Sequence, residues 1–161
     1  MNIFYLDSNP KIAAQAMTNK HVVKMILESA QLLSTAHHLI DGDQATDKDL
    51  LYKPTHHNHP SAVWVRQSAL HYLWLYEHFM ALCNEYTERY GKIHATFTKL
   101  AMPLANFPKN IVYVDFVQPP CAMPDQYKVS NDSVTSYRNY YIGEKLKLDS
   151  DINRFISIFT V

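Results

Sequence analysis

The sequence predicts a mainly α-helical protein, a single-domain bundle of about five helices with one irregular proline-rich segment. Apolar residues recur at spacings of three and four through most of the chain, which is the period of an amphipathic helix. Only three glycines occur in 161 residues, too few for a turn-rich β-sandwich, a glycine-rich phosphate loop or a dinucleotide fingerprint. Five of the eight prolines fall between residues 103 and 130 and exclude regular helix there. A hydrophobic fraction of 47% suits one self-supporting domain over residues 1–161.

Capping residues and apolar periodicity define the expected helices. Ser8 or Asn9 caps a short helix that begins at Pro10, and Thr18 with Asn19 caps a long second helix. The expected helices cover residues 10–17, 20–39, 60–90 and 93–102, with a last one from a cap at 131 or 132 to about 145. A short edge strand is expected over residues 111–117 within the irregular segment 103–130. The tail, residues 149–161, receives no assigned place.

Charge and cysteine content narrow the classes of function. Lys plus Arg and Asp plus Glu each number 15, so the net charge is zero, whereas a protein that holds duplex DNA by counterion release is usually basic. Any role in nucleic-acid binding must therefore rest on a local patch. Cys83 and Cys121 form no Cys-x-x-Cys pair, which argues against a disulfide scaffold and a thiolate zinc site. The start does not read as a signal peptide and no apolar run is long enough to span a bilayer, so we expect no membrane partner.

One polar row interrupts the otherwise apolar helix expected over residues 20–39. Its members are spaced by three or four residues and so share a face: His21, Lys24, Glu28, Gln31, Thr35 and His38. Burying such groups without partners costs several kcal/mol, so the row faces solvent, pairs with another polar surface or lines a cleft. Two interpretations stay open. One is a solvated face, and the other is a pocket wall in which a carboxylate lies between two bases, an arrangement suited to acid–base chemistry.

A second concentration of polar groups is the histidine-rich loop, residues 53–60 (Lys-Pro-Thr-His-His-Asn-His-Pro). Its imidazoles can simply be solvated. Alternatively, Lys53, His56, His59 and Arg66 bind a phosphate or another part of a substrate together with the free N–H groups where the next helix starts. A third interpretation is a metal ion held by His37, His56 and His59. Because no motif such as His-Glu-x-x-His is present, we expect neither a metal site nor a cofactor.

Two further patterns predict little chemistry. The steps His59-Pro60-Ser61 and His94-Ala95-Thr96 follow the His-x-Ser/Thr pattern of two-histidine phosphodiesterases, but the pattern is short and common by chance. Glu85 and Arg89 have the spacing of a routine i,i+4 ion pair, worth a few tenths of a kcal/mol.

The last expected helix interleaves aromatic and basic side chains: Tyr137, Arg138, Tyr140, Tyr141 and Lys145. Such a series can stack on nucleobases and contact phosphates. The three tyrosines also share one helical face, which is how a core-packing face looks. Both interpretations stay open.

The spacing His21-x6-Glu28, followed near the C-terminus by residues 136–145 (Ser-Tyr-Arg-Asn-Tyr-Tyr-Ile-Gly-Glu-Lys), resembles the pyrimidine-dimer DNA glycosylases of T-even phages. The resemblance implies a small all-helical enzyme with Glu28 as the catalytic carboxylate and His21 as its neighbour. It also implies that Tyr137, Tyr140, Tyr141 and Lys145 approach the nucleic acid. Over about residues 1–146 the chain resembles an uncharacterised family of phage proteins as well, through segments such as 20–25 (Lys-His-Val-Val-Lys-Met) and 89–92 (Arg-Tyr-Gly-Lys). This second resemblance implies the cytoplasm of an infected host cell and no particular activity.

The chain departs from the glycosylase pattern at the nucleophile. The family attacks with the α-amine of a processed N-terminal threonine, whereas here Met1 precedes Asn2, a residue that hinders removal of methionine. The arginines that flank the family's glutamate become Leu27 and Gln31. Lys24, one turn before Glu28, is the available side-chain amine, and we expect burial in the helix to make it nucleophilic.

We therefore expect an enzyme that cleaves the N-glycosidic bond of a nucleotide or a damaged DNA base, with lyase activity where an amine attacks. Glu28 is the expected carboxylate, with His21 and Lys24 as its catalytic partners. The expected substrate contacts are Lys20, Gln31, Lys53, His56, His59, Arg66, Tyr137, Tyr140, Tyr141 and Lys145. The alternative is a phage accessory protein with a counter-defence role that binds a nucleotide or another partner without chemistry.

Overall fold

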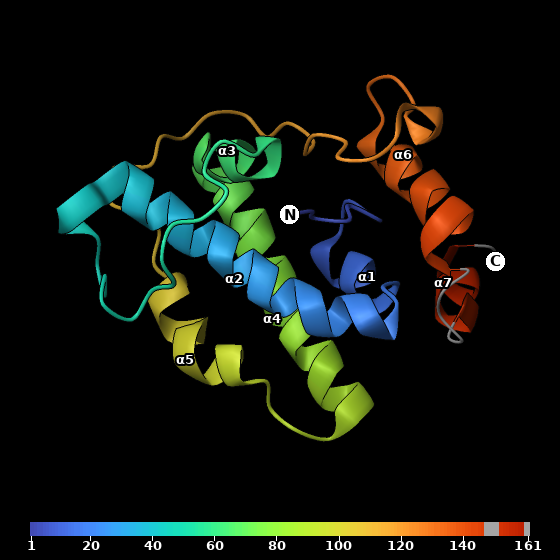
Figure 1. Cartoon of the computed structure of the whole chain (residues 1–161), viewed down its shortest axis with the longest axis horizontal. Helices are drawn as coiled ribbons and strands as arrows, with labels where there is room; N and C mark the ends of the chain where they lie inside the picture. Colours follow the sequence, from blue (N-terminus) through green and yellow to red (C-terminus); the bar gives the residue numbers. More distant parts are fainter. Residues whose placement is uncertain (147–151, 160–161) are drawn as a thin grey trace.

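The computed structural model describes residues 1–146 and 152–159. Its described residues form seven α-helices and no strand, which confirms the mainly α class (Figure 1). The helices are α1 (Pro10–Gln15), α2 (Asn19–Asp41), α3 (Pro60–Arg66), α4 (Ala69–Tyr90), α5 (Ala95–Leu104), α6 (Ser133–Tyr140) and α7 (Ile152–Phe159). Single 3-10 turns cover Gly42–Gln44 and Asp125–Tyr127, and a π-helical turn, Tyr141–Lys145, extends α6. No described helix has the length and apolar character that crossing a membrane requires.

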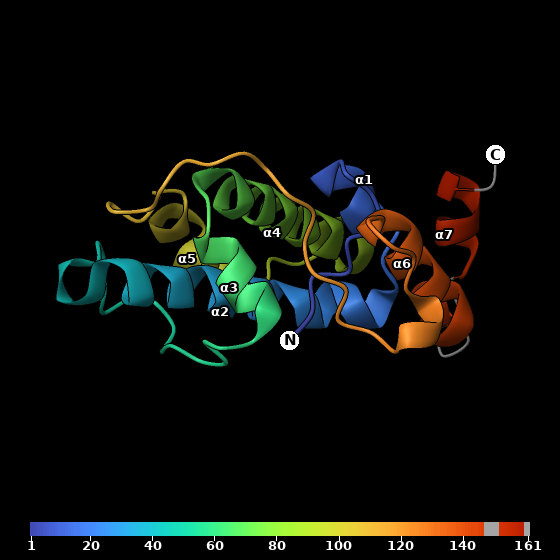
Figure 2. The ribbon, with the colours of Figure 1, turned by 90° about the horizontal axis from the view of Figure 1, so that it is seen from above.

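The two long helices, α2 and α4, pack against each other at the centre of the fold, with α1 on α4 and both α3 and α5 on α2 (Figure 1). Each long helix begins at a hydroxyl cap: Thr18 Oγ1 accepts from the His21 N–H, and Ser68 Oγ accepts from the Leu70 N–H. Fully buried apolar side chains fill the space between them: Ile26, Leu33, Leu75, Phe79 and Leu82. Seen from above, α6 and α7 lie together at the end of the molecule where α2 begins (Figure 2).

The helix expected over residues 60–90 is two helices, with a break at Gln67 and Ser68. Ser68 has an extended backbone and caps α4. Its hydroxyl also donates to the Val114 carbonyl at 2.6 Å, which ties the start of α4 to the proline-rich segment. The periodicity of apolar residues along the chain does not reveal this long-range hydrogen bond. For that reason the prediction of one helix was wrong.

The edge strand expected over residues 111–117 is also wrong. The segment is extended. Side chains of α3 and α4, rather than a neighbouring strand, make the hydrogen bonds that hold it. Trp64 Nε1 donates to the Val117 carbonyl at 2.8 Å, and His71 Nε2 accepts from the Val117 N–H at 3.0 Å. Helix α5 also runs through Pro103 to Leu104, because a proline in the last turn removes only one helical hydrogen bond.

The ion pair Glu85–Arg89 is buried and central, contrary to the expectation of a routine surface pair. The Arg89 and Glu85 side chains are only 3% and 7% exposed, and Arg89 Nη2 lies 2.9 Å from Glu85 Oε1. The guanidinium also donates to the carbonyls of Gln15 and Met17 and to Asn19 Oδ1. Arg89 therefore fixes the junction between α1 and α2 from its place on α4, and with it the start of the helix that carries Glu28.

The end of the chain packs as a short helix in the described part of the tail. Phe155 of α7 is buried, with its ring stacked at 5.8 Å from Tyr141. The Arg138 guanidinium lies 3.8 Å above the ring of Phe159. Of the tail that the sequence left unplaced, residues 149–151 and 160–161 lie outside the described residues.

Candidate active site

Glu28 lies on α2 facing the beginning of the chain. The amino group of Met1 lies 3.7 Å from Glu28 Oε1, and Lys24 Nζ lies 4.0 Å from Oε2. The Glu28 side chain is 15% exposed, and Oε2 is buried without a hydrogen-bond partner. A half-satisfied carboxylate between two amines is costly for stability alone, because each unpaired buried acceptor loses its hydration. The arrangement is therefore a candidate for chemistry.

The first residues are held in a defined path that delivers the amine to Glu28. Asn2 donates from Nδ2 to the Ala122 carbonyl at 2.9 Å, and its Oδ1 accepts from the N–H groups of Ile3 and Phe4. Phe4 is buried with a φ of 54°, a left-handed conformation that a bulky residue rarely adopts. Strain of this kind persists only where surrounding contacts fix the backbone, and such positions gather at functional sites.

His21 lies two turns before Glu28, about 10 Å away along the helix axis. Its ring stacks on Phe4 with centroids 4.2 Å apart, and its Nδ1 is 2.6 Å from the Tyr141 hydroxyl. Tyr141 in turn accepts from the Thr18 N–H. His21 thus joins the start of α2, the N-terminal segment and the end of α6.

The polar row of α2 is neither a plain solvated face nor a continuous pocket wall. Its N-terminal half meets the beginning of the chain at Glu28, while Gln31 is half-buried. Its C-terminal half pairs with the histidine-rich loop. Thr35 Oγ1 accepts from the Thr55 N–H at 3.1 Å, and His38 Nε2 is 3.1 Å from the Tyr52 carbonyl. The row therefore brings the loop alongside the helix that carries Glu28.

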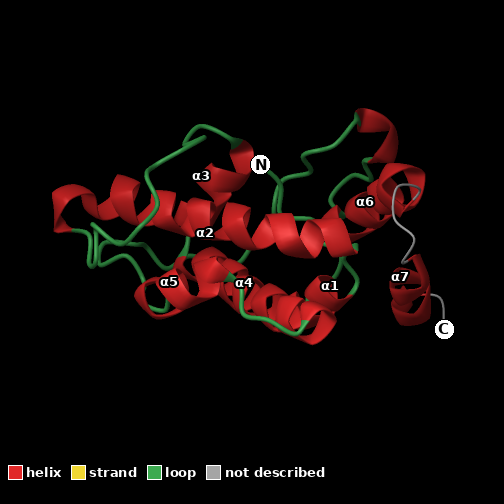
Figure 3. Cartoon of the chain, turned by 60° about the horizontal axis from the view of Figure 1, so that its bottom comes forward, coloured by secondary structure: helices red, strands yellow, loops and turns green. Residues whose placement is uncertain are grey.

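Three views agree that the N-terminus lies beside α2 and α3 (Figures 1 to 3). His59, the residue before α3, caps that helix: its Nδ1 accepts from the Ser61 N–H at 3.1 Å. Burial, followed by the charges of the Met1 amine and of His56, lowers the pKa of His59. The Met1 amine is therefore among the charges that act on His59.

The phosphate clamp expected at the start of α3 is only partly available. The N–H groups of Ser61 and Val63 are occupied by the side chain and the carbonyl of His59. Arg66 donates to the His57 carbonyl at 2.8 Å and so holds the loop. Lys53, His56 and, on α2, Lys20 are exposed. The cap therefore occupies two of the N–H groups that were expected to bind an anion here.

His59 and His94, the histidines of the two His-x-Ser/Thr sequences, have a structural role. His94 Nδ1 accepts from the Thr96 N–H at 3.1 Å, in the same way that His59 caps α3. Both steps are therefore helix caps. The proposed metal ligand His37 is buried, with Nε2 2.8 Å from the Tyr72 hydroxyl. Among the described residues no group of three or more His, Cys, Asp or Glu side chains could hold a metal ion.

The C-terminal tyrosines are mostly part of the core. Tyr137 and Tyr141 are fully buried, and Tyr137 donates to the Pro120 carbonyl at 2.8 Å. Both are therefore unavailable to stack on a nucleobase, which corrects the expectation for these two residues. Tyr140 is half-buried, and Lys145 lies over its ring with Nζ 4.8 Å from the centroid.

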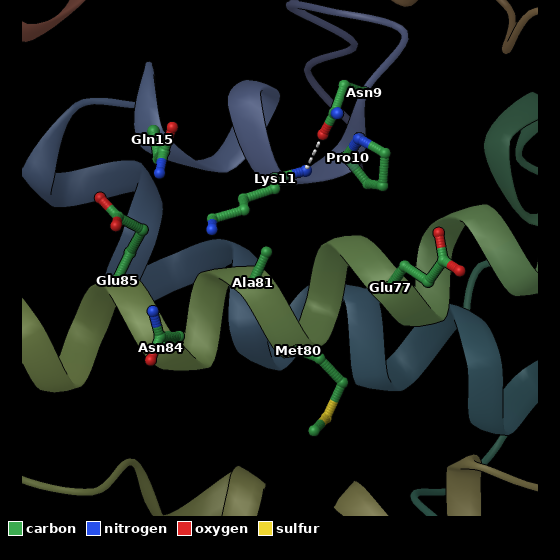
Figure 4. A pocket seen from close by; sticks show the side chains of 9 residues that line it. All are labelled: Asn9, Pro10, Lys11, Gln15, Glu77, Met80, Ala81, Asn84 and Glu85. Atoms are coloured by element: carbon green, nitrogen blue, oxygen red, sulfur yellow. Dashed lines mark hydrogen bonds between the residues drawn. The ribbon is translucent and has the colours of Figure 1, made fainter.

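Two hollows lie between elements of the fold. One, of about 460 Å³, lies beside His59 between α3 and residues 117–120, and its lining includes Asn58, Val63 and Gln67 but no charged side chain. The other, of about 490 Å³, lies between α1 and α4 and includes Lys11, Glu77 and Glu85 (Figure 4). None of the residues expected to form the site lines either hollow.

The group that sequence reasoning undervalued is the amine of Met1. Lys24, expected as a buried amine, is 63% exposed on the surface of α2. The Met1 side chain, by contrast, is only 2% exposed. The available signal was the apolar segment 2–6 ahead of the first helix cap, since an apolar lead-in has to pack on the core and carries its terminus with it.

Comparison with known protein families gives a match. The model of a protein family described as pyrimidine dimer DNA glycosylase matches residues 1–99. The matched part contains Met1, Glu28, the histidine-rich loop and helices α1 to α4, and excludes the tyrosines of α6. Searches of curated proteins and of solved structures found no match.

Proposed function

The chain belongs to the pyrimidine dimer DNA glycosylase family, and on that premise we propose that it excises a damaged pyrimidine from DNA with Glu28 and the Met1 amine as its reacting groups. One observation carries the proposal. An amine lies 3.7 Å from a carboxylate whose second oxygen is buried and accepts no hydrogen bond.

The chemistry follows from these two groups. The unprotonated nitrogen attacks C1′ of the sugar while the bond from C1′ to the base breaks, and the base leaves with the electron pair and takes up a proton. Glu28 accepts the proton that the nitrogen releases and stabilises positive charge at C1′. Opening of the sugar at O4′ then leaves an imine between C1′ and the nitrogen. Loss of a C2′ proton from this imine expels the 3′ phosphate, which is the lyase step.

Two amines compete for the role of nucleophile. Lys24 Nζ is 4.0 Å from Glu28, but its exposed side chain samples many rotamers, and ordering it costs entropy. The Met1 amine is held by a buried side chain and by the anchored Asn2. Because holding two reacting groups in place lowers the barrier, the Met1 amine is the better candidate.

The uncharged hollow beside His59 suits the base. Its amide side chains, Asn58 and Gln67, offer both donors and acceptors, and its apolar lining accommodates a flat ring. Lys20, Lys24 and Lys53 are the exposed cations nearby for the phosphate backbone. We infer a phage origin, and action in the cytoplasm of an infected host cell, from the resemblance of the sequence to phage proteins.

The test is borohydride trapping on DNA that carries a single pyrimidine dimer. The wild-type protein is expected to break the bond from C1′ to one pyrimidine of the dimer, whose ring stays joined to its neighbour, and to form a covalent adduct. Glu28→Gln is expected to lower the rate of glycosidic cleavage by at least about a hundredfold, the scale of a general acid–base residue, with the unfolding midpoint retained. Lys24→Gln serves as the matched variant and is expected to keep the adduct.

Peptide mapping of the adduct identifies the nucleophile. After trypsin digestion, the mass of the DNA remnant should appear on the peptide of residues 1–11, or from residue 2 onward where methionine has been removed. An adduct on Lys24 would overturn the assignment of the amine. Full activity of Glu28→Gln would show that Glu28 is not the catalytic carboxylate. Tight binding of unchanged DNA or nucleotide would favour the alternative, a binding protein without catalysis.

A further inference from the structure

Helix α3 begins with an uncommon cap, a histidine ring in place of a hydroxyl or carboxylate. His59 Nδ1 accepts from the Ser61 N–H at 3.1 Å, so this nitrogen has to present its lone pair. In a neutral imidazole the other nitrogen then carries the proton. The cap thus assigns the ring proton to Nε2, which forms no hydrogen bond to any described residue.

The ring is held neutral as well as oriented. Protonation would place a hydrogen on Nδ1, directly against the Ser61 N–H, and would uncap the helix. Burial and the charges of the Met1 amine and His56 act in the same direction, since all three lower the pKa of His59. Near neutral pH the residue is therefore an uncharged ring with one unused N–H.

The backbone around His59 is fixed on both sides. The His59 N–H donates to the His56 carbonyl at 2.9 Å, and Arg66 Nη1 donates to the His57 carbonyl at 2.8 Å. Two residues before the turn, Thr55 is hydrogen-bonded in both directions to Thr35 of α2. An oriented donor on a fixed turn loses little entropy on binding an acceptor, so it is suited to ligand recognition.

The chemistry of the site selects the acceptor. The Met1 amine and the exposed lysines already supply positive charge, whereas a nucleotide presents two phosphates next to any sugar whose C1′ is attacked. A phosphate oxygen accepts strong hydrogen bonds from neutral donors as well as from cations. A neutral donor also avoids adding a second positive charge beside the amine, which must lose its proton to react.

We propose that the Nε2–H of His59 donates to a non-bridging phosphate oxygen of the nucleotide whose sugar lies at Met1 and Glu28. This inference rests on the proposed function and adds a substrate-binding residue to it. His59 acts as a single neutral donor that selects one phosphate, and the cap on α3 is the device that sets its tautomer.

His94 provides the matched control, because it caps α5 through the same nitrogen and the same spacing, and it lies outside the site. Asparagine is a favourable cap that preserves the hydrogen bond to the backbone and removes the imidazole N–H. The probe is a duplex with one tetrahydrofuran abasic analogue, measured by fluorescence anisotropy. His59→Asn is expected to bind it about tenfold more weakly, the scale of one hydrogen bond to a charged group, and His94→Asn to bind as the wild type does.

Methylphosphonate substitution locates the phosphate. At one position next to the analogue, removal of the phosphate charge should weaken wild-type binding about tenfold and should have almost no effect on His59→Asn. If every position weakens both proteins equally, the proposed contact is wrong. An unchanged affinity of His59→Asn would also overturn it, even if the wild type excises bases.

A second measurement on the wild-type protein does not depend on how the variant folds. Nitrogen NMR of the His59 ring near neutral pH should show a protonated Nε2 and an unprotonated Nδ1. A proton on Nδ1 would contradict the inference. If the wild-type protein cleaves no glycosidic bond in dimer-containing DNA but the methylphosphonate cycle still isolates one phosphate, the proposed catalysis fails and the His59 contact stands as a binding contact.

Discussion

Individual histidines join distant parts of this protein. In each of them the hydrogen bonds define which ring nitrogen carries the proton. His71 is 2.7 Å from the Trp64 carbonyl through Nδ1 and accepts from the Val117 N–H through Nε2. His78 is 2.9 Å from the Pro10 carbonyl through Nδ1 and so links α4 to α1, while its buried Nε2 has no partner. A buried neutral ring of this kind resists protonation, because its charged form would lose hydration.

The cost of charging His78 predicts a pH-dependent stability. Burial lowers its pKa from 6.5 to about 4. Between these values the unfolded chain binds a proton that the folded chain does not, so the free energy of unfolding falls as the pH falls. Above pH 6.5 the His78 titration does not change the free energy of unfolding. Between pH 6.5 and about pH 4 it lowers the free energy of unfolding progressively, by a total on the order of 3 kcal/mol.

His78→Gln removes this titration and keeps a donor for the Pro10 carbonyl. Urea unfolding between pH 7 and pH 4 should therefore show a shallower acid slope in His78→Gln, by up to about 1.4 kcal/mol per pH unit. The control His57→Gln changes an exposed ring and should follow the wild-type curve. An identical slope in His78→Gln and the wild type would show that His78 is protonated in the folded state.

At the scale of elements, the ion pair Glu85–Arg89 decides where α2 begins. One guanidinium satisfies the end of α1, the residue before the α2 cap and the first residue of α2 through Gln15, Met17 and Asn19. Arg154 Nη1 lies 3.8 Å from Glu85 but makes a looser contact from a half-exposed side chain. The pair is therefore a joint between helices, and its loss should loosen the path that leads to Glu28.

Arg89→Ala is expected to lower the free energy of unfolding by about 3–5 kcal/mol, because it leaves the Glu85 carboxylate buried and largely unpaired. The double variant Arg89→Met with Glu85→Leu should recover most of this loss, since neither charge is then left alone. Lys128→Ala breaks the exposed pair with Asp125 and should leave the urea midpoint almost unchanged. A loss in Arg89→Ala no larger than that in Lys128→Ala would show that the network contributes little.

The whole molecule carries no net charge, which sets how it can meet DNA. The residues expected to contact the substrate or react with it include three exposed lysines, Lys20, Lys24 and Lys53, while Arg66 is engaged with the loop. Three phosphate contacts release about three counterions, in contrast with the larger number released by basic DNA-binding proteins. We therefore expect a short footprint centred on the damaged nucleotide.

The salt dependence of binding measures this footprint. The logarithm of the affinity for a duplex with an abasic analogue should fall against the logarithm of salt concentration with a slope of about −3. Lys20→Ala should make the slope shallower by about one, whereas Lys92→Ala, in the connection between α4 and α5, should not change it. A wild-type slope steeper than about −6 would indicate a long duplex footprint and contradict this expectation.

The amino-acid sequence by itself determined the helical class, three of the helix caps and the place of Glu28 in a polar row. Thr18, Asn9 and Asp132 cap the helices expected at those positions, because a cap depends on residues two or three positions away. The resemblance to the glycosylase family also indicated Glu28. These features depend on local spacing, which can be read directly from the chain.

Only the tertiary structure decided which groups meet. The Met1 amine reaches Glu28 because residues 1–6 pack on the core, and the loop at His59 joins them because Thr55 pairs with Thr35. The same packing places Tyr137 and Tyr141 inside and divides the expected helix at Ser68. Burial and hydrogen bonds between residues far apart in the chain depend on how the helices pack together, and the spacing of residues along one helix carries no record of that packing.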